Sequence, residues 1–366
     1  WVRDVLNPIV VGITGSTGKT SVKDLLASIV KGRMSVIASE KSFNNELGVP
    51  LTLARTKGDT RVVVVEMGAR GVGQIRDLCN LARPHMGIVT NVGVTHYEMF
   101  GSRAAIARAK GELVEAIPEG GAAILNADDP LVAGMSRRRG DLVDVLTYGI
   151  AEKAWLQGQE VKIDRLGRPT FRMAQGSQRG VWVEMQVSGV HQVMNALAAS
   201  AAALALGLTL EDCRIGLEAA EISPWRMQIR EAGGAVIVND AYNASPTSVA
   251  SALQTCAGMT RDGGRLVVIL GHMAELGNLA ETEHARIGAL AASLASRLVA
   301  VGPGAVPIAE GALREGMTDV VQVPDAAAAV AAVGALGRGD VLLVKGSRVA
   351  ALEQVSDLVE QGMAGS

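Results

Sequence analysis

Short apolar runs alternate with helix-length segments along most of the chain. In these runs apolar residues follow one another directly, as in the four valines at 62–65, rather than alternating with polar ones. Because a strand covered on both faces is apolar on both, such runs indicate a parallel sheet with helices on each side. The first part has expected strands at 9–14, 61–67, 86–91 and 122–126, and expected helices at 19–31, 72–82 and 103–117.

The pattern changes twice farther along the chain. Between 161 and 187 short alternating runs are separated by polar turns, which predicts a small antiparallel flap, and 189–206 returns to helical spacing. After Pro224 the β/α rhythm restarts, with strands expected at 235–239, 265–270, 297–301 and 340–344. We therefore expect two α/β domains: a central domain over 1–225 with a mostly parallel sheet and the flap, and a Rossmann-like C-terminal domain over 226–366.

The composition agrees with two aliphatic domains. Of the 366 residues 48% are hydrophobic and only 3% aromatic, so the cores must consist largely of Val, Leu, Ile and Ala. A net charge of −2, with no basic block longer than 137–139, argues against a nucleic-acid surface. Cys79, Cys213 and Cys256 stand far apart in apolar stretches, which predicts reduced, buried thiols in a cytoplasmic protein. No apolar run has the length needed to span a bilayer.

The first expected strand leads directly into a glycine loop that ends in Gly-Lys-Thr. A strand, such a loop and the start of a helix place backbone N–H groups, a lysine and a hydroxyl around the phosphates of a nucleotide. The usual spacing needs a glycine where Ile13 stands, so the match is to a shorter form of the phosphate-binding loop. The alternative is a turn without function, but the flanking strand and helix favour ATP binding. The residues expected to contact ATP here are Gly15, Ser16, Thr17, Gly18, Lys19, Thr20 and Ser21.

Three further side chains stand where chemistry is plausible. Glu66 ends the second expected strand, so at the carboxyl edge of the sheet it could reach a metal held by Thr20, or be a solvated glutamate. His96 follows the third strand and could ligate a second metal or be structural. Lys110 lies in a helix of small apolar residues, where a lysine either extends to solvent or takes part in chemistry. Only nine of the 35 basic residues are lysines, so each lysine in a motif is informative.

Taken in order, the motifs of the whole chain resemble the Mur ligase family. They lie at 15–20, 66–69, 91–96, 109–112, 189–197, 225–227, 239–246, 270–277 and 344–348. Within the family, the segment Ser-Phe-Asn-Asn-Glu-Leu-Gly-Val-Pro at 42–50 is most similar to members that add D-alanyl-D-alanine to UDP-N-acetylmuramoyl-tripeptide. Such relatives carry an N-terminal domain that binds the UDP part of the substrate. This chain starts at Trp1, where the linker of that domain should end, so we expect it to lack the domain.

The resemblance implies a role for each matching residue. Lys19 would contact the ATP phosphates, Thr20 and Glu66 would bind one magnesium ion, and His96 would ligate a second. Lys110 would react with carbon dioxide to form a carbamate, which replaces a cation that repels magnesium by an anionic oxygen ligand. Asn195 is expected beside the adenine, Arg226 and Asp240 on the phosphates and ribose after domain closure, Tyr242 and Asn243 near the nucleotide, and Asn44 and Asn45 near the peptide substrate. The residues expected to be catalytic are Lys19, His96, Lys110 and Arg226.

Several of these segments also have structural interpretations. The segments 240–243 and 345–348 could be turns after strands, and 126–130 is read as turn chemistry, with a nucleotide role as the alternative. Two residues depart from the family pattern: Gln192 replaces an asparagine and His272 an acidic residue. We predict no catalytic role for His272, and the departure weakens any role for Gln192.

The implied reaction is ATP-dependent amide ligation in peptidoglycan precursor synthesis. The substrate's carboxylate would attack the γ-phosphate of ATP, and the incoming amine would attack the resulting acyl phosphate. We expect ATP, UDP-muramoyl-peptide and D-alanyl-D-alanine as partners of a cytoplasmic monomer that neither binds nucleic acid nor inserts into a membrane. Two alternatives stay open: a related enzyme that joins other amino acids or peptides in specialised metabolism, and a non-catalytic nucleotide-binding module. The presence of Glu66, His96 and Lys110 argues against the second.

Overall fold

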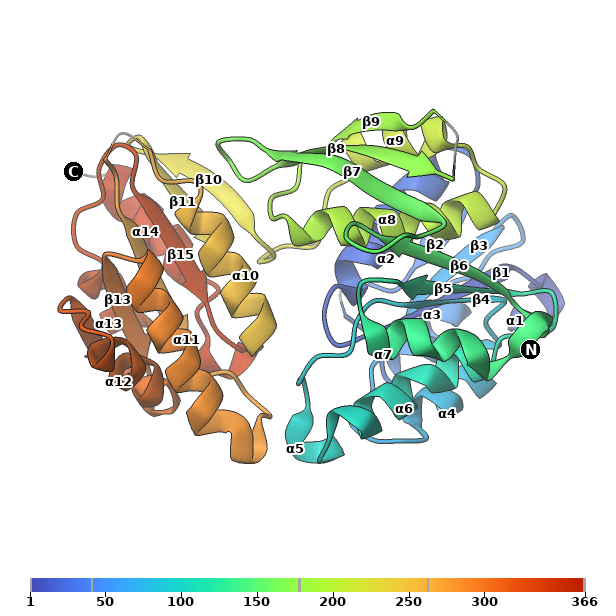
Figure 1. The fold of residues 1–366 in the computed structure, drawn as a ribbon, viewed down its shortest axis with the longest axis horizontal. Helices are drawn as coiled ribbons and strands as arrows, with labels where there is room; N and C mark the ends of the chain where they lie inside the picture. The colour runs from blue at the N-terminus through green and yellow to red at the C-terminus, as the bar shows by residue number, and fades with distance from the viewer. Residues whose placement is uncertain (1, 41, 177–178, 262, 365–366) are drawn as a thin grey trace.

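Two α/β units lie side by side in the protein (Figure 1), a computed structural model that describes residues 2–40, 42–176, 179–261 and 263–364. The chain completes the first unit before it enters the second. Each unit has one sheet with apolar clusters on both of its faces. The α/β class and the two mostly parallel sheets predicted from the apolar runs are thereby confirmed.

The first sheet has nine strands in the order β2-β3-β1-β4-β5-β6-β7-β8-β9. The pairs from β2 to β7 are parallel, whereas β8 is antiparallel to both of its neighbours. The predicted antiparallel flap is therefore an extension of the main sheet, joined to it by the short β6–β7 pairing. The strands are β1 (Ile9–Thr14), β2 (Val36–Ala38), β3 (Val62–Glu66), β4 (Met86–Val89), β5 (Ala122–Asn126), β6 (Asp144–Gly149), β7 (Leu156–Ile163), β8 (Pro169–Gln175) and β9 (Val181–Glu184).

Helices cover this sheet on both faces. They are α1 (Val2–Leu6), α2 (Lys19–Lys31), α3 (Gly48–Ala54), α4 (Gln74–Ala82), α5 (Tyr97–Phe100), α6 (Arg103–Glu115), α7 (Pro130–Ala133), α8 (His191–Ala205) and α9 (Leu210–Glu218). The predicted helix at 19–31 has the predicted bounds, and the helices predicted at 72–82 and 103–117 are each two residues shorter than expected.

The second sheet has six strands in the order β10-β11-β15-β12-β13-β14, and only β10 is antiparallel to its neighbour. Its strands are β10 (Gln228–Ala232), β11 (Ala235–Asn239), β12 (Leu266–Gly271), β13 (Arg297–Val301), β14 (Val320–Val323) and β15 (Val341–Lys345). Its helices are α10 (Pro246–Ala257), α11 (Ala280–Leu294), α12 (Val306–Arg314), α13 (Ala326–Ala332) and α14 (Val355–Ala364). The predicted boundary between 225 and 226 falls in the segment that joins α9 to β10, and it stays a prediction.

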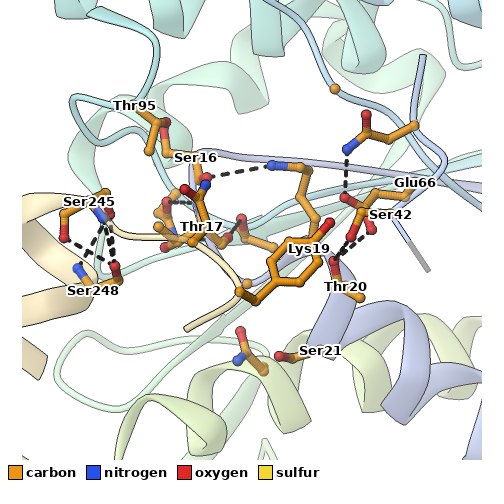
Figure 2. A pocket seen from close by; sticks show the side chains of 18 of the residues that line it. Ser16, Thr17, Lys19, Thr20, Ser21, Ser42, Glu66, Thr95, Ser245 and Ser248 are labelled. Carbon is orange, nitrogen blue, oxygen red and sulfur yellow. Dashed lines mark hydrogen bonds between the residues drawn. The ribbon is translucent and has the colours of Figure 1, made fainter. Parts of the chain in front are cut away.

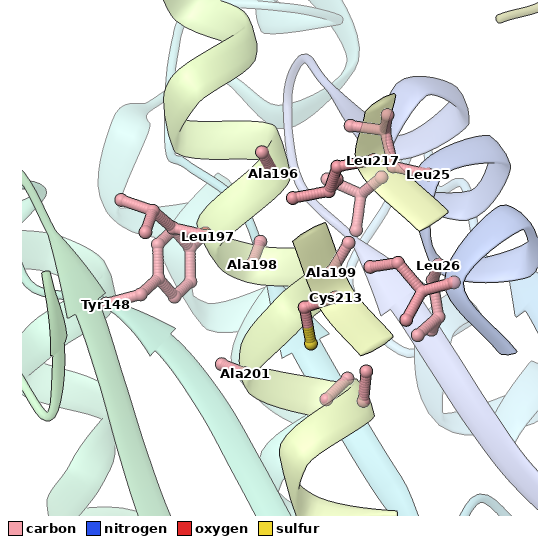
Figure 3. Packing of buried hydrophobic residues seen from close by; sticks show 14 of the residues in the cluster. Leu25, Leu26, Tyr148, Ala196, Leu197, Ala198, Ala199, Ala201, Cys213 and Leu217 are labelled. Carbon is pink, nitrogen blue, oxygen red and sulfur yellow. The ribbon is translucent and has the colours of Figure 1, made fainter. Parts of the chain in front are cut away.

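Small side chains allow the helices of the first unit to pack closely. Figure 3 shows the alanines of α8, among them Ala199, beside leucines of α2 such as Leu26. At Gly216 of α9 an added Cβ would lie 2.4 Å from the Cα of Ile29, so the two helix backbones are in direct contact. Cys213 is buried in the same cluster as a free thiol, like Cys79 and Cys256 in theirs, as predicted. This packing anchors α2, whose first turn follows the glycine loop.

The second unit has an equally close helix contact, between α11 and α12. A Cβ at Gly288 would lie 1.9 Å from the carbonyl oxygen of Ile308, and one at Gly311 would lie 2.2 Å from that of Ala285. No Cβ fits at such distances, so any side chain at either glycine must push the helices apart.

We expect Gly288→Ala to lower the free energy of unfolding of the second unit by about 1–3 kcal/mol, because overpacking a tight contact costs that much. Gly362→Ala is the matched control, since Gly362 is also helical but has nothing within 4 Å of an added Cβ. That variant should be neutral or about 0.5–1 kcal/mol more stable. Urea unfolding followed by circular dichroism measures both, and equal stability of the two variants would contradict the packing argument.

Candidate active site

The glycine loop is held in shape by side chains that follow β4. The backbone N–H of Thr17 donates to Oδ1 of Asn91 (3.0 Å), and Nδ2 of Asn91 donates to Oγ1 of Thr17 (2.9 Å). Oγ1 of Thr90 donates to the carbonyl of Thr17 (2.6 Å). Gly18 has φ +84°, and a Cβ there would lie 2.5 Å from Oδ1 of Asn195. The loop therefore keeps its conformation by hydrogen bonds to the neighbouring strand end and by a glycine in the left-handed region.

Lys19 lies at the first turn of α2 and is folded back over the loop. Its Nζ donates to the carbonyl oxygen of Gly15 at 2.8 Å. Figure 2 shows the Lys19 side chain directed toward Ser16 of the loop. Burial lowers the pKa of Lys19, and the negative charge of Glu66 counteracts that shift. A half-buried ammonium close to the backbone groups of the loop suits a polyanionic ligand.

Glu66 ends β3 and is almost fully buried at 2% exposure. Its Oε2 accepts a hydrogen bond from Oγ1 of Thr20 (2.8 Å), and its Oε1 accepts one from Nδ2 of Asn44 (2.9 Å). The parallel register of β1 with β3 explains the meeting, since both strands end at the same edge of the sheet. A carboxylate and a hydroxyl side by side are oxygen donors of the kind that Mg²⁺ prefers.

Arg226 comes from the segment between the units and reaches into the first one. Its Nη2 donates to Oγ1 of Thr20 (2.9 Å) and lies 3.3 Å from Oγ of Ser42. Its guanidinium carbon also lies 4.0 Å from the centre of the Tyr242 ring, a cation–π contact to the second unit. Trp225 and Met227 on either side have φ of +61° and +51°, so the backbone is strained where it delivers this side chain.

The second unit contributes an ion pair to the opposite wall. Nζ of Lys345, at the end of β15, lies 2.5 Å from Oδ2 of Asp240 and donates to the carbonyl of Asn243 (3.0 Å). Oδ1 of Asp240 accepts from the backbone N–H of Met227 (3.1 Å). Lys345 is 2% exposed, so this pair is buried and its two charges depend on each other.

Lys110 lies on α6 and is 3% exposed, so it does not extend to solvent. Burial lowers its pKa well below the usual lysine value, and the charge of Lys19 lowers it further. Among the described residues no hydrogen bond or ion pair involves the Lys110 side chain. A neutral amine is therefore much more accessible at Lys110 than at an exposed lysine.

His96 precedes α5, in the left-handed region at φ +57°. Its Nδ1 is hydrogen-bonded to Oε2 of Glu275, a residue of the second unit. Burial lowers the pKa of His96; Glu275 opposes this shift, whereas the charges of Lys19 and Lys110 add to it. The two lysines and the histidine are thus close enough for their charges to interact, although they come from different elements.

A cavity of about 940 Å³ lies between the units and brings most of the predicted residues together. In Figure 2, Lys19, Thr20 and Glu66 face it from the first unit, with Ser245 and Ser248 of α10 on another side. The predicted residues in its lining are Ser16, Thr17, Gly18, Lys19, Thr20, Ser21, Asn44, Asn45, Glu66, His96, Asn195, Arg226, Asp240, Tyr242 and Asn243. Gly15 and Lys110 are not part of the lining.

The cavity is also lined by residues for which we predicted no role from the sequence. Lys345, Ser42 and Gln192 line it, and Gln192 accepts a hydrogen bond from Nδ2 of Asn195 (2.9 Å). Glu275 lies outside this lining, but it is hydrogen-bonded to His96, which belongs to it. Lys345 could have been chosen from the scarcity of lysines and its place at a strand end, the signals that also marked Lys19 and Glu66. The turn role expected at 126–130 is confirmed in part, because Asp129 caps α7.

Two features are absent from the part of the chain that the structure describes. No group of three or more His, Cys, Asp and Glu side chains in them could hold a metal ion. A cation here would need other ligands as well, such as a hydroxyl, a modified lysine or phosphate oxygens. In the same residues no helix is both long and apolar enough to cross a membrane.

Comparison with known proteins identifies the family that the chain resembles. Residues 13–203 match the Mur ligase middle domain, and residues 225–348 match the domain described as "Mur ligase, glutamate ligase domain". The chain is 42% identical to the UDP-N-acetylmuramoyl-tripeptide–D-alanyl-D-alanine ligase of Mycobacterium tuberculosis, over 98% of this chain and 74% of that protein. It is 32% identical to the Escherichia coli ligase of the same name, over 97% of this chain and 77% of the other.

Two solved structures are similar along the whole chain. MurF from Acinetobacter baumannii superposes with a TM-score of 0.89 at 30% identity, covering 98% of this chain and 78% of that one. The MurF ligase from Thermotoga maritima, solved in complex with ADP, gives 0.87 at 26% identity, covering all of this chain and 83% of that one.

The buried ion pair yields a prediction for stability. Lys345→Met should lower the free energy of unfolding by about 3 kcal/mol, because it leaves the Asp240 carboxylate without its cation. Adding Asp240→Asn should recover much of that loss, since no charge then stays uncompensated.

Lys153→Met, at an exposed lysine, is the control and should change stability by less than about 0.5 kcal/mol. Urea unfolding of the native protein, Lys345→Met, Asp240→Asn and the double variant completes the cycle. Additive losses in the double variant would show that the two charges do not compensate each other.

Proposed function

This chain belongs to the Mur ligase family of ATP-dependent amide-bond ligases, and we propose that it joins D-alanyl-D-alanine to UDP-N-acetylmuramoyl-tripeptide. The single observation that carries the proposal is the hydrogen bond between Thr20 and Glu66, to which Arg226 adds a bond from the segment between the units. These contacts place two oxygen ligands and a guanidinium beside a phosphate-binding loop. The choice of substrate rests on the named ligases that resemble nearly the whole chain. Such a ligase would act on cytoplasmic precursors, and we propose that this one does so as a monomer.

ATP would bind in the cavity with its phosphates on the loop. The loop N–H groups and the half-buried Lys19 ammonium would neutralise the phosphates, and the start of α2 adds its dipole. Asn195, which contacts Gly18 from α8, would lie beside the adenine. Arg226 and Asp240 would lie on the phosphates and ribose, with Tyr242 and Asn243 of the second unit near the nucleotide. Asn44 and Asn45 would face the peptide substrate, where Asn44 already donates to Glu66.

A first magnesium ion would be held by Thr20 and Glu66. The residues fit it, because a buried carboxylate and a hydroxyl are hard oxygen ligands already in contact. When bound, the ion would supply charge neutralisation between the phosphates. Arg226 donates to the same hydroxyl, so its positive charge would lie beside the ion unless the guanidinium moves toward the phosphates.

A second ion would take His96 and a carbamate on Lys110. The carbamate forms when the neutral amine attacks carbon dioxide: a new N–C bond is made and one proton is released. The lowered pKa of Lys110 favours this neutral amine. As an ammonium, by contrast, Lys110 would repel the ion.

The reaction needs placement and charge neutralisation more than covalent help from the protein. The substrate's carboxylate oxygen would attack the γ-phosphorus, and the bond to ADP would break, leaving an acyl phosphate. The amine of D-alanyl-D-alanine would then attack the acyl carbon, lose a proton and expel inorganic phosphate. Lys19 and Arg226 would stabilise the charge that moves between the phosphates, and contact between the units would exclude water from the acyl phosphate.

Phosphate release tests the proposal directly. The 366-residue chain is incubated with ATP, magnesium, saturating UDP-N-acetylmuramoyl-tripeptide and a panel of amines. We expect release that depends on both substrates and is fastest with D-alanyl-D-alanine. Release with another amino acid instead would favour a related ligase of different specificity. ATP binding without release for any amine would favour a nucleotide-binding module.

Lys110 can be tested by substitution and by isotope labelling. Lys110→Ala should lower turnover by about 100-fold or more, because a lost metal ligand removes several kcal/mol of transition-state stabilisation. Depletion of bicarbonate should slow the native enzyme. In ¹³C-bicarbonate the native protein should show a carbamate carbon signal that is absent from Lys110→Ala.

Lys57→Ala, at an exposed lysine, is the control and should keep both turnover and the carbamate signal. A fully active native protein without any carbamate signal would contradict the role proposed for Lys110.

A further inference from the structure

The segment that follows β12 crosses from the second unit to the first at Glu275. The carbonyl oxygen of Glu275 accepts a hydrogen bond from the backbone N–H of Glu98 (3.2 Å), at the start of α5. A Cβ at Gly277 would lie 3.1 Å from the Cα of Glu98, so the two backbones approach closely. Glu275 itself has φ +63°, which turns its side chain out of the regular path of the segment. These backbone contacts between the units therefore fix the position of the Glu275 carboxylate.

Both oxygens of that carboxylate are held by the first unit. Oε1 lies 3.1 Å from Nη2 of Arg70, and Oε2 is hydrogen-bonded to Nδ1 of His96. Arg70 follows β3 and His96 follows β4, so one residue of the second unit ties together the ends of the two strands that flank β1 in the first. The Glu275 side chain is 32% exposed and that of His96 28%, so the contact lies at the edge of the cavity.

The hydrogen bond has a consequence for the imidazole. An ionised carboxylate only accepts hydrogen bonds, so the Nδ1 atom of His96 must carry the hydrogen. In the neutral ring the lone pair then lies on Nε2. Within the described residues no hydrogen bond involves Nε2 of His96, so that atom is available to a ligand.

We propose that Glu275 is a positioning residue: it fixes the Nδ1–H tautomer of His96 and so presents Nε2 to the second cation when the two units are closed. The proposal rests on the metal role of His96 in the proposed function. Carboxylates that orient a metal-binding histidine in this way raise the metal affinity of many sites. Here the carboxylate belongs to the other unit, so closure and cation binding support each other, because coupling between two equilibria is reciprocal.

Two readouts that need no ligation test this role. In the nucleotide-free protein, ¹⁵N NMR of the histidine side chains should show His96 as the Nδ1–H tautomer, with the signal assigned by its loss in His96→Gln. Glu275→Ala should lose that tautomer. The magnesium concentration at half-maximal binding of AMP-PNP should rise about 10-fold in Glu275→Ala, the effect expected for loss of an orienting carboxylate.

Two further variants separate this role from a merely structural one. Glu281→Ala removes an exposed carboxylate near the start of α11 and should leave both readouts within twofold of the native protein. Glu275→Gln keeps an oxygen that can accept the Nδ1 hydrogen, so it should retain the tautomer even if Glu275→Ala does not fold.

An unchanged His96 tautomer and an unchanged magnesium midpoint in Glu275→Ala would overturn the proposal, as would loss of the tautomer in Glu275→Gln. Both readouts omit the peptide and the amine. A native protein that passes them but releases no phosphate with any amine therefore counts against the proposed function alone.

Discussion

Burial of charge between the two units constrains most of what surrounds the cavity. Glu66, Lys110 and Lys345 are buried and Lys19 is half-buried, and a buried ion is costly unless another charge or a set of hydrogen bonds compensates it. Glu66 has a hydroxyl and an amide, and Lys345 has Asp240. Lys110 has only a lowered pKa, which allows it to lose its charge. Lys110 can therefore be neutral beside the positive charge of Lys19, and a ligand that brings negative charge would stabilise this part of the site.

The aliphatic composition has a matching consequence for rigidity. Alanines and glycines let α8 and α9 lie directly on α2, so the helix that carries Lys19 and Thr20 is held by close backbone contacts. On its other side the loop is bound to Thr90 and Asn91. Both supports come from the first unit. The glycine-loop side of the cavity is thus preorganised without any help from the second unit, whereas Arg226 reaches it from the segment between the units and Glu275 from the second unit.

These two kinds of support explain what the sequence could predict. The strand–loop–helix at 9–31 was predicted with the observed bounds, because continuous apolar runs and glycines are local signals. The strands β2, β6, β10 and β14 were not predicted; most of their residues are only partly buried, so their apolar signal is weak. The contact of His96 with Glu275 joins residues 179 positions apart, and no local pattern reports it. Motif order placed Arg226 at the site, but its bond to Thr20 depends on how the units sit together.

The backbone on both sides of Arg226 is strained, and this strain affects the contacts that Arg226 makes with the two units. Two non-glycine residues in the left-handed region cost about 1–3 kcal/mol each, and here they flank the side chain that contacts both units. The Thr20 hydrogen bond and the cation–π contact with Tyr242 offset part of that cost in this arrangement of the units. A cation bound to Thr20 would repel the guanidinium from this position, because the two positive charges would lie side by side. The strained segment therefore holds a side chain that contacts both units, so the position of Arg226 depends on how the two units sit together.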